Sequence, residues 1–119
     1  MVVEIIIGVL YALGAVGQTT FVLRNSEKFY SDMANRAWFP PSVLFVRRVL
    51  LPKSEIVTVL VILLEAGLAV GILTGGASVG PALVIGGFFS ILGGITGSPG
   101  ETLGYWALAG VHFWLASGQ

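Results

Sequence analysis

The chain has 119 residues, of which 55% are hydrophobic and only 10% are charged, and its mean hydropathy is +0.94. A soluble domain carries about 25% charged residues, so a soluble enzyme and a disordered chain are both disfavoured. The formal net charge is zero, which argues against a nucleic-acid partner, and the absence of cysteine excludes disulfides, cysteine-ligated zinc and iron–sulfur clusters. We therefore expect lipid to surround most of the chain.

Four apolar stretches are each close to the roughly 20 residues that a helix needs to cross a bilayer. In chain order they cover residues 5–23, 56–75, 79–96 and 99–117. None shows the alternation of a barrel strand, and four strands could not close a barrel. The sequence therefore predicts an all-α integral membrane four-helix bundle that forms a single domain over residues 1–119.

Residues 24–55 form an unusually long connection between the first two spans. Phe29, Tyr30 and Met33 recur there at helical spacing, and a second apolar run, residues 43–51, follows two prolines. We expect two short amphipathic helices at the membrane surface, hinged near Trp38. Two interpretations stay open: the segment is an interfacial anchor, or it covers a site between the helices or docks a partner.

Every basic residue of the chain lies within residues 24–53, at positions Arg24, Lys28, Arg36, Arg47, Arg48 and Lys53. Basic residues near span ends favour the cytoplasmic side of a membrane. We therefore expect a multi-pass protein of the cell membrane with a cytoplasmic loop 24–53 and both termini outside.

Capping signals mark two of the span boundaries. Ser54 is a candidate cap for the second span, and the run from Ser98 to Glu101 has the pattern of a capping box with proline at the first helical position. The connections after the second and third spans are only a few residues long. Each short turn predicts that the spans it joins are antiparallel neighbours.

Small residues recur every four positions on two of the spans. One stripe is Gly67, Gly71 and Gly75, and the other is Gly86, Ser90 and Gly94. In lipid, small residues allow helices to approach closely. We expect the second and third spans to pack against each other along these two stripes.

Ionisable groups at membrane depth are costly and need a partner or a function. The candidates for ligand binding or proton handling are Glu65, His112, Tyr11, Gln18 and Tyr105. At 100° per residue, the first and fourth spans each place their polar residues on one face, and Tyr11, Glu65 and His112 fall within about one helical turn in depth. Either Glu65 bonds to His112 or Tyr11 and only specifies packing, or the cluster binds a polar head group or passes a proton.

The chain resembles the DoxX-like family of small four-helix membrane proteins. The residues that carry the resemblance are Phe29-Tyr30 with Met33, Trp38-Phe39-Pro40, Glu65-Ala66-Gly67 and the segment from Gly71 to Gly75, with Arg24 as a loose counterpart of the basic residue that closes the first span. The resemblance implies a membrane component of a redox system.

With no cysteine and a single histidine, the chain would not carry electrons itself. We expect a small accessory or quinone-side subunit of a membrane oxidoreductase complex, with membrane lipid and other redox subunits, or further copies of the chain, as partners. A quinone or a lipid is the expected ligand, without a metal or a covalent cofactor. The alternatives are a component of a proton-coupled small transporter that uses Glu65, and a purely structural subunit. Whether the chain is itself an enzyme stays open.

Overall fold

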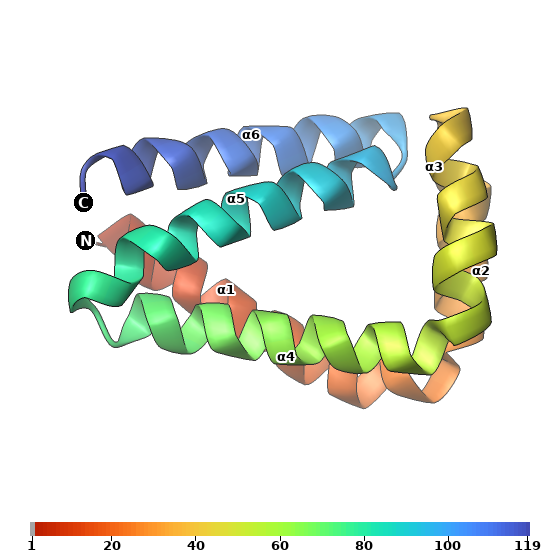
Figure 1. The fold of residues 1–119 in the computed structure, drawn as a ribbon, viewed down its shortest axis with the longest axis horizontal. Coiled ribbons are helices and arrows are strands. Elements are labelled where there is room, and N and C mark those ends of the chain that lie inside the picture. Colours follow the sequence, from red (N-terminus) through yellow and green to blue (C-terminus); the bar gives the residue numbers. More distant parts are fainter. Residues whose placement is uncertain (1) are drawn as a thin grey trace.

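The computed structural model describes residues 2–119, which are almost entirely helical and contain no strand. Four long helices run side by side along the longest dimension of the molecule, and two short ones lie across one end (Figure 1). The long helices are α1 (Val2–Gly17), α4 (Ser54–Leu73), α5 (Val79–Ile95) and α6 (Pro99–Ser117). The short helices are α2 (Ser26–Arg36) and α3 (Pro40–Phe45). The predicted all-helical class is confirmed, and the two short helices fall within the predicted interfacial connection.

Two sharp bends separate the short helices from the long ones. After α1 the chain continues through a π-helical turn, Gln18–Val22, and a 3-10 turn, Leu23–Asn25, and α3 is likewise extended to residue 53. The backbone leaves the helical region at Asn25 (φ −132°, ψ 42°) and at Lys53 (φ −121°, ψ 36°). The chain therefore turns at these two residues, which places α2 and α3 across the ends of the long helices.

Three helical stretches are long and apolar enough to cross a membrane. They are Val2–Arg36, Pro40–Leu73 and Gly76–Ile95, each counted through its bend where it has one. By length and composition the chain is therefore a membrane protein. Helix α6 spans residues 99–117 as the sequence predicts, but it is not among the three stretches that meet this measure.

The distribution of side chains is the reverse of that in a soluble domain. Large apolar side chains such as Phe21, Leu63 and Leu103 point outward from the long helices. Polar side chains including Thr58 and His112 are fully buried. Contiguous exposed apolar surface of this kind indicates contact with lipid or with other proteins.

The long helices form two pairs that meet at one end of the molecule. Helix α1 packs along α4 and α5 packs along α6, and the pairs converge near the two termini and diverge toward α2 and α3 (Figure 1). The main apolar cluster joins all four long helices, with Ile7, Leu68, Ile72 and Leu83 among its members. A second cluster around Tyr30 and Val46 joins the α2–α3 segment to the start of α4. Residues midway along α4 therefore lie between two apolar cores.

The boundary signals give one correct and one incorrect prediction. At the start of α6, the Glu101 N–H donates to Ser98 Oγ and the Ser98 N–H donates to Glu101 Oε1, so the capping box is confirmed. Ser54 does not cap α4, because Lys53 occupies the cap position without a side-chain hydrogen bond. The Ser54 hydroxyl instead lies 2.8 Å from the Ser26 hydroxyl and links the two bends.

The small-residue stripe of α4 contacts α5 at only one of its three positions. A Cβ atom at Gly71 would lie 3.1 Å from Ala82 Cβ, whereas a Cβ atom at Gly67 would meet nothing within 4 Å. Gly75 lies beyond the helix, where its φ of 74° forms the turn. Gly71 therefore contacts α5, but at Ala82, which lies outside the stripe of Gly86, Ser90 and Gly94. The predicted contact between the two stripes is wrong, since α4 and α5 diverge from this turn onward (Figure 1).

The stripe of α5 packs against α1 and α6 instead. A Cβ atom at Gly86 would lie 2.6 Å from Tyr11 Oη and 2.8 Å from the His112 ring. A Cβ atom at Gly94 would lie 2.7 Å from the Trp106 ring. These glycines leave room for large side chains from neighbouring helices rather than for close approach of α4.

Candidate functional site

Tyr11 of α1 and His112 of α6 form a buried polar pair between the two helix pairs. The Tyr11 hydroxyl lies 2.7 Å from His112 Nε2, and His112 Nδ1 lies 2.7 Å from the carbonyl oxygen of Leu108. A carbonyl oxygen can only accept, so Nδ1 carries the hydrogen and Nε2 of the neutral ring accepts from Tyr11. Both ring nitrogens of His112 are therefore satisfied, and the pair needs nothing further.

The polar groups next to this pair are also hydrogen-bonded. The Ser90 hydroxyl, one of the predicted small-stripe residues, donates to the Gly86 carbonyl oxygen at 2.9 Å. The same carbonyl lies 3.3 Å from the Tyr11 hydroxyl. A buried polar group is costly unless it is hydrogen-bonded, and here each group has a partner. These hydrogen bonds connect α1, α5 and α6.

Glu65 of α4 does not join the Tyr11–His112 pair. Its side chain is only 7% exposed and points at α1, where a Cβ atom at Gly14 would collide with Glu65 Oε2. Oε2 is buried and accepts no hydrogen bond from any residue between 2 and 119. The hydrogen bond expected between Glu65 and His112 or Tyr11 is thus absent. The Tyr11 hydroxyl is bonded to His112, and Glu65 contacts α1 one helical turn further along, at Gly14.

Gln18 carries the second unpartnered oxygen of the described chain. Its Oε1 is buried and has no hydrogen-bond partner among residues 2–119. Gln18 stands one turn after Gly14, and helical side chains lean toward the preceding turn, so the Gln18 carboxamide is directed along α1 toward the turn that Glu65 faces. Gln18 also begins the π-helical turn of α1, a feature that is frequent at functional sites.

The chain has three tyrosines, Tyr11, Tyr30 and Tyr105, and none of them donates to the unpartnered Glu65 Oε2. Tyr105, a predicted site residue, is 41% exposed and packs beside Gly93 of α5.

Gly14, which lies against Glu65 Oε2, was not assigned to the site by sequence analysis, and neither was the buried Tyr30. Tyr30 is 3% exposed and lies next to Thr58 of α4. Its place on the apolar face of α2 was visible in the helical spacing of residues 29, 30 and 33. That spacing was interpreted as one face of a surface helix, either an interfacial anchor or a cover over a site between the helices or a docking element, and the bend at residue 25 turns Tyr30 inward.

The arrangement around Glu65 can accept hydrogen bonds or hold a proton. Among residues 2–119 no group of three or more histidine, cysteine, aspartate or glutamate side chains could hold a metal ion. The buried side-chain polar atoms that the described part of the chain leaves unpartnered are one carboxyl oxygen of Glu65 and the carboxamide oxygen of Gln18.

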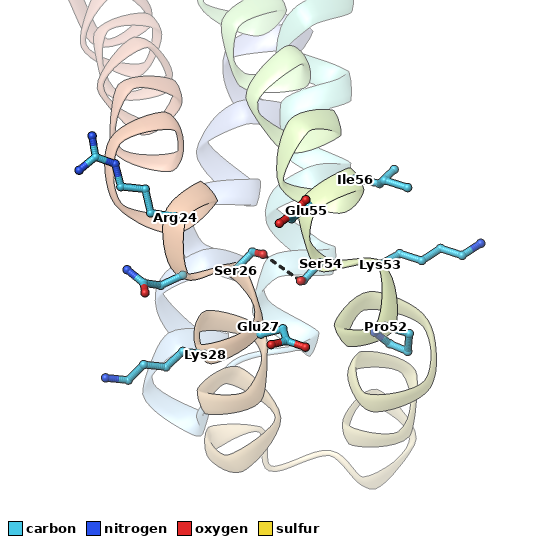
Figure 2. A pocket seen from close by; sticks show the side chains of 10 residues that line it. Arg24, Ser26, Glu27, Lys28, Pro52, Lys53, Ser54, Glu55 and Ile56 are labelled. Carbon is cyan, nitrogen blue, oxygen red and sulfur yellow. Dashed lines mark hydrogen bonds between the residues drawn. The ribbon is translucent and has the colours of Figure 1, made fainter.

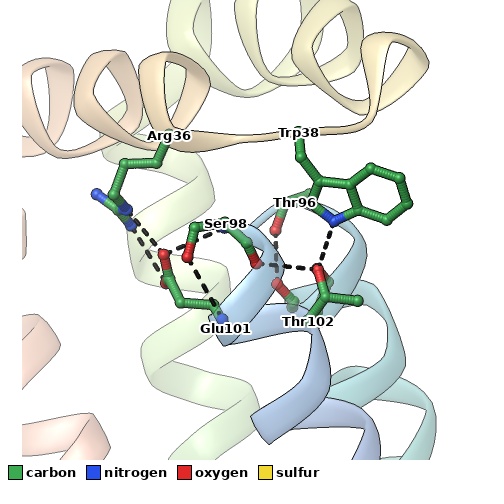
Figure 3. A network of polar contacts seen from close by, with 8 residues as sticks. Arg36, Trp38, Thr96, Ser98, Glu101 and Thr102 are labelled. Carbon is green, nitrogen blue, oxygen red and sulfur yellow. Dashed lines mark hydrogen bonds and ion pairs between the residues drawn. The ribbon is translucent and has the colours of Figure 1, made fainter.

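The α2–α3 segment is attached to α6 by two polar contacts (Figure 3). The Arg36 guanidinium donates to Glu101 Oε1 at 2.9 Å, and the Trp38 indole N–H donates to Thr102 Oγ1 at 2.7 Å. Glu101 lies in the first turn of α6, outside the three apolar stretches. The hydrogen bond from Arg36 lowers the pKa of the Glu101 carboxyl. The segment thus bridges both helix pairs at the end where they diverge.

Two open pockets lie away from Glu65. A polar pocket of about 530 Å³ lies at the bends, between the start of α2 and the start of α4, with the Ser26–Ser54 hydrogen bond at its centre (Figure 2). Its lining mixes both signs of charge, from Arg24, Lys28 and Lys53 on one hand and Glu27 and Glu55 on the other.

The second pocket is apolar and lies between α1 and α4, with a volume of about 460 Å³. It is lined by Ala12, Ala15, Ala66, Ala69, Val70, Leu73 and Thr74. Neither of these two pockets is lined by Glu65 or Gln18.

No family model matches this sequence, and no curated protein or solved structure is significantly similar to it.

Proposed function

We propose that the chain is an integral membrane protein whose four long helices cross the bilayer while α2 and α3 lie at one surface. The outward apolar side chains and the buried polar ones support this arrangement. The longest dimension of 38 Å suits a hydrocarbon core of about 30 Å with one interfacial layer of helix. Helix α6 is the least apolar of the four, and its packing against α5 and the bonding of both His112 nitrogens would lower the cost of burying it.

The orientation we propose follows from charge. All six basic residues lie in or next to α2 and α3, at the end of the molecule opposite the two termini (Figure 1). We therefore place the α2–α3 end in the cytoplasm and both termini outside.

For the activity, we propose a DoxX-like accessory or quinone-side subunit of a membrane oxidoreductase complex. The observation that carries this proposal is the buried Glu65 carboxyl with an unpartnered oxygen at mid-depth between two apolar cores. A buried charged or polar group without a partner costs several kcal/mol in low dielectric, and a function is the common reason for keeping one. A quinone head group exchanges both hydrogen bonds and protons, which are the two things a single carboxyl can offer.

Electrons would come from another subunit. The chain has no cysteine, and its single histidine is bonded through both ring nitrogens. The role of this chain would then be to bind the head group and to exchange protons with it at Glu65.

A component of a proton-coupled transporter is the second candidate, and the same carboxyl favours it. A transporter of this size would form a homodimer and bind its substrate in a pH-dependent way, without associating with a flavin-bearing or haem-bearing assembly. A purely structural subunit would bind no small molecule and would be indifferent to Glu65→Gln.

The test is quinone binding by purified protein in mild detergent. We expect a short-chain quinone to bind above the level of protein-free micelles in at least one of its oxidation states. Glu65→Gln should weaken binding of the hydroquinone form about tenfold or more, because the titrating group is lost while the shape is kept. Leu63→Ala is the matched control, since Leu63 lies on the same helix and is 64% exposed. Absence of binding to the wild type, or equal binding by Glu65→Gln, would overturn the quinone-side function.

A further inference from the structure

The two unpartnered oxygens near Gly14 have the same hydrogen-bonding character. Glu65 Oε2 belongs to a carboxyl group that accepts when ionised, and Gln18 Oε1 belongs to a carboxamide whose oxygen always accepts. Neither oxygen has a donor among residues 2–119, so each is an acceptor that the protein itself leaves unpaired.

The neighbouring hydroxyls do not supply the missing donor. The Tyr11 hydroxyl has a single hydrogen and gives it to His112 Nε2 at 2.7 Å. Tyr30 lies beside Thr58, whose own hydroxyl donates to the Ser54 carbonyl oxygen at 2.7 Å. Tyr105 interacts with Glu65 only electrostatically and packs beside Gly93.

We infer that the site between Glu65 and Gln18 takes a ligand that donates a hydrogen bond, with Gln18 as a second residue that determines its specificity. This inference rests on the proposed quinone-side function and narrows it. A hydroquinone has two hydroxyl groups, and one of them can donate to Glu65 or Gln18. A quinone has only carbonyl oxygens, which would place acceptor against acceptor. The reduced form is therefore the preferred ligand.

Gly14 provides a variant that moves the carboxyl without removing it. A Cβ atom at this position would overlap Glu65 Oε2, which is the end of a flexible side chain and can shift. Gly14→Ala should therefore fold, because alanine also favours the helix, while displacing the carboxyl from Gln18. Gly17→Ala is the matched control, since it makes the same change on the same helix and its Cβ atom would meet nothing within 4 Å.

The experiment compares a decyl-substituted benzoquinone with its hydroquinone, by titration calorimetry under argon against protein-free micelles. We expect the wild type and Gly17→Ala to bind the hydroquinone about tenfold or more tightly than the quinone. Gly14→Ala and Glu65→Gln should reduce that preference to about threefold or less. Gln18→Leu should weaken hydroquinone binding about threefold or more, as expected for loss of one neutral hydrogen bond.

The outcomes separate this inference from the function on which it rests. If the wild type binds both forms equally, or the quinone more tightly, the donor preference is wrong while the quinone-side function stands. Such a result would mean that a proton on Glu65 or a reversed Gln18 amide already satisfies the two oxygens. If Gly14→Ala keeps the full preference, the assignment of the site to Gly14 is wrong. If neither form binds above micelles, both the inference and the function fail.

Discussion

The Tyr11–His112 pair and Glu65 are both buried in this bundle, and they differ in how completely they are hydrogen-bonded. The Tyr11–His112 pair uses every donor and acceptor on the imidazole ring, and Gly86 leaves it room. Glu65 has a buried oxygen, Oε2, that accepts no hydrogen bond from residues 2–119. Buried polar groups that are fully bonded fix the packing of helices, whereas one left unpartnered is available to a ligand or a proton.

The largest expected effect comes from removing the room around the satisfied pair. A leucine at Gly86 would overlap both Tyr11 Oη and the His112 ring, so Gly86→Leu should lower the free energy of unfolding by about 3 kcal/mol. Unfolding in mixed detergent micelles, followed by circular dichroism, would measure it. A loss below about 1 kcal/mol would show that the pair does not hold the helices together.

A purely steric contact provides the reference for that effect. Gly71→Leu would push against Ala82, whose Cβ lies 3.1 Å from the position of the added atom, and should cost about 2 kcal/mol. Gly67→Leu on the same helix should cost little, since nothing lies within 4 Å of its Cβ position. Thermal unfolding in detergent compares the two, and equal midpoints would contradict the contact between α4 and α5.

The hydrogen bond of the pair can be removed without changing its packing. Tyr11→Phe leaves His112 Nε2 buried without a donor and should lower the free energy of unfolding by about 1 kcal/mol. The same mixed-micelle assay measures the change. An unaltered stability would mean that His112 finds another donor, and the description of the pair as a closed unit would be wrong.

Substitution of Glu65, the unpartnered group, should not lower the stability as substitution of Tyr11 does. Glu65→Gln removes a buried carboxyl that forms no compensating hydrogen bond, so stability should stay unchanged or rise by up to about 1 kcal/mol. Measured beside Tyr11→Phe, this variant tests the comparison directly. A decrease of 2 kcal/mol or more in the free energy of unfolding would show that Glu65 has a structural partner and is not free to bind a ligand.

The sequence was sufficient to predict the helices, because apolar length and capping residues are local properties. The capping box at Ser98 and the helix over residues 99–117 are examples. Pairwise contacts depended on how the helices cross, which a helical wheel does not contain. The helical positions of Tyr11 and His112 correctly predicted that these two side chains meet. Glu65 was expected at the same level, but it contacts α1 one turn further along, at Gly14. Tyr30 was missed for a similar reason, because the residues around Asn25 mark the start of a helix but not the direction in which the chain bends there.

The smallest effect is expected at the exposed contact between Arg36 and Glu101, which is satisfied like the Tyr11–His112 pair but lies near water. Both side chains are more than a third exposed, so Arg36→Gln should cost about 0.5 kcal/mol or less. Because Arg36 lowers the pKa of Glu101 in the folded state, its contribution is complete above the ordinary value of 4.5 and declines as the pH falls through the lowered value. The stability difference between wild type and Arg36→Gln, measured from pH 7 down to pH 3, should therefore shrink on the acid side. A stability difference that grows as the pH falls would contradict the lowered pKa of Glu101. A difference above 2 kcal/mol at pH 7 would show that hydrogen bonding, rather than burial, decides how much a polar contact stabilises this protein.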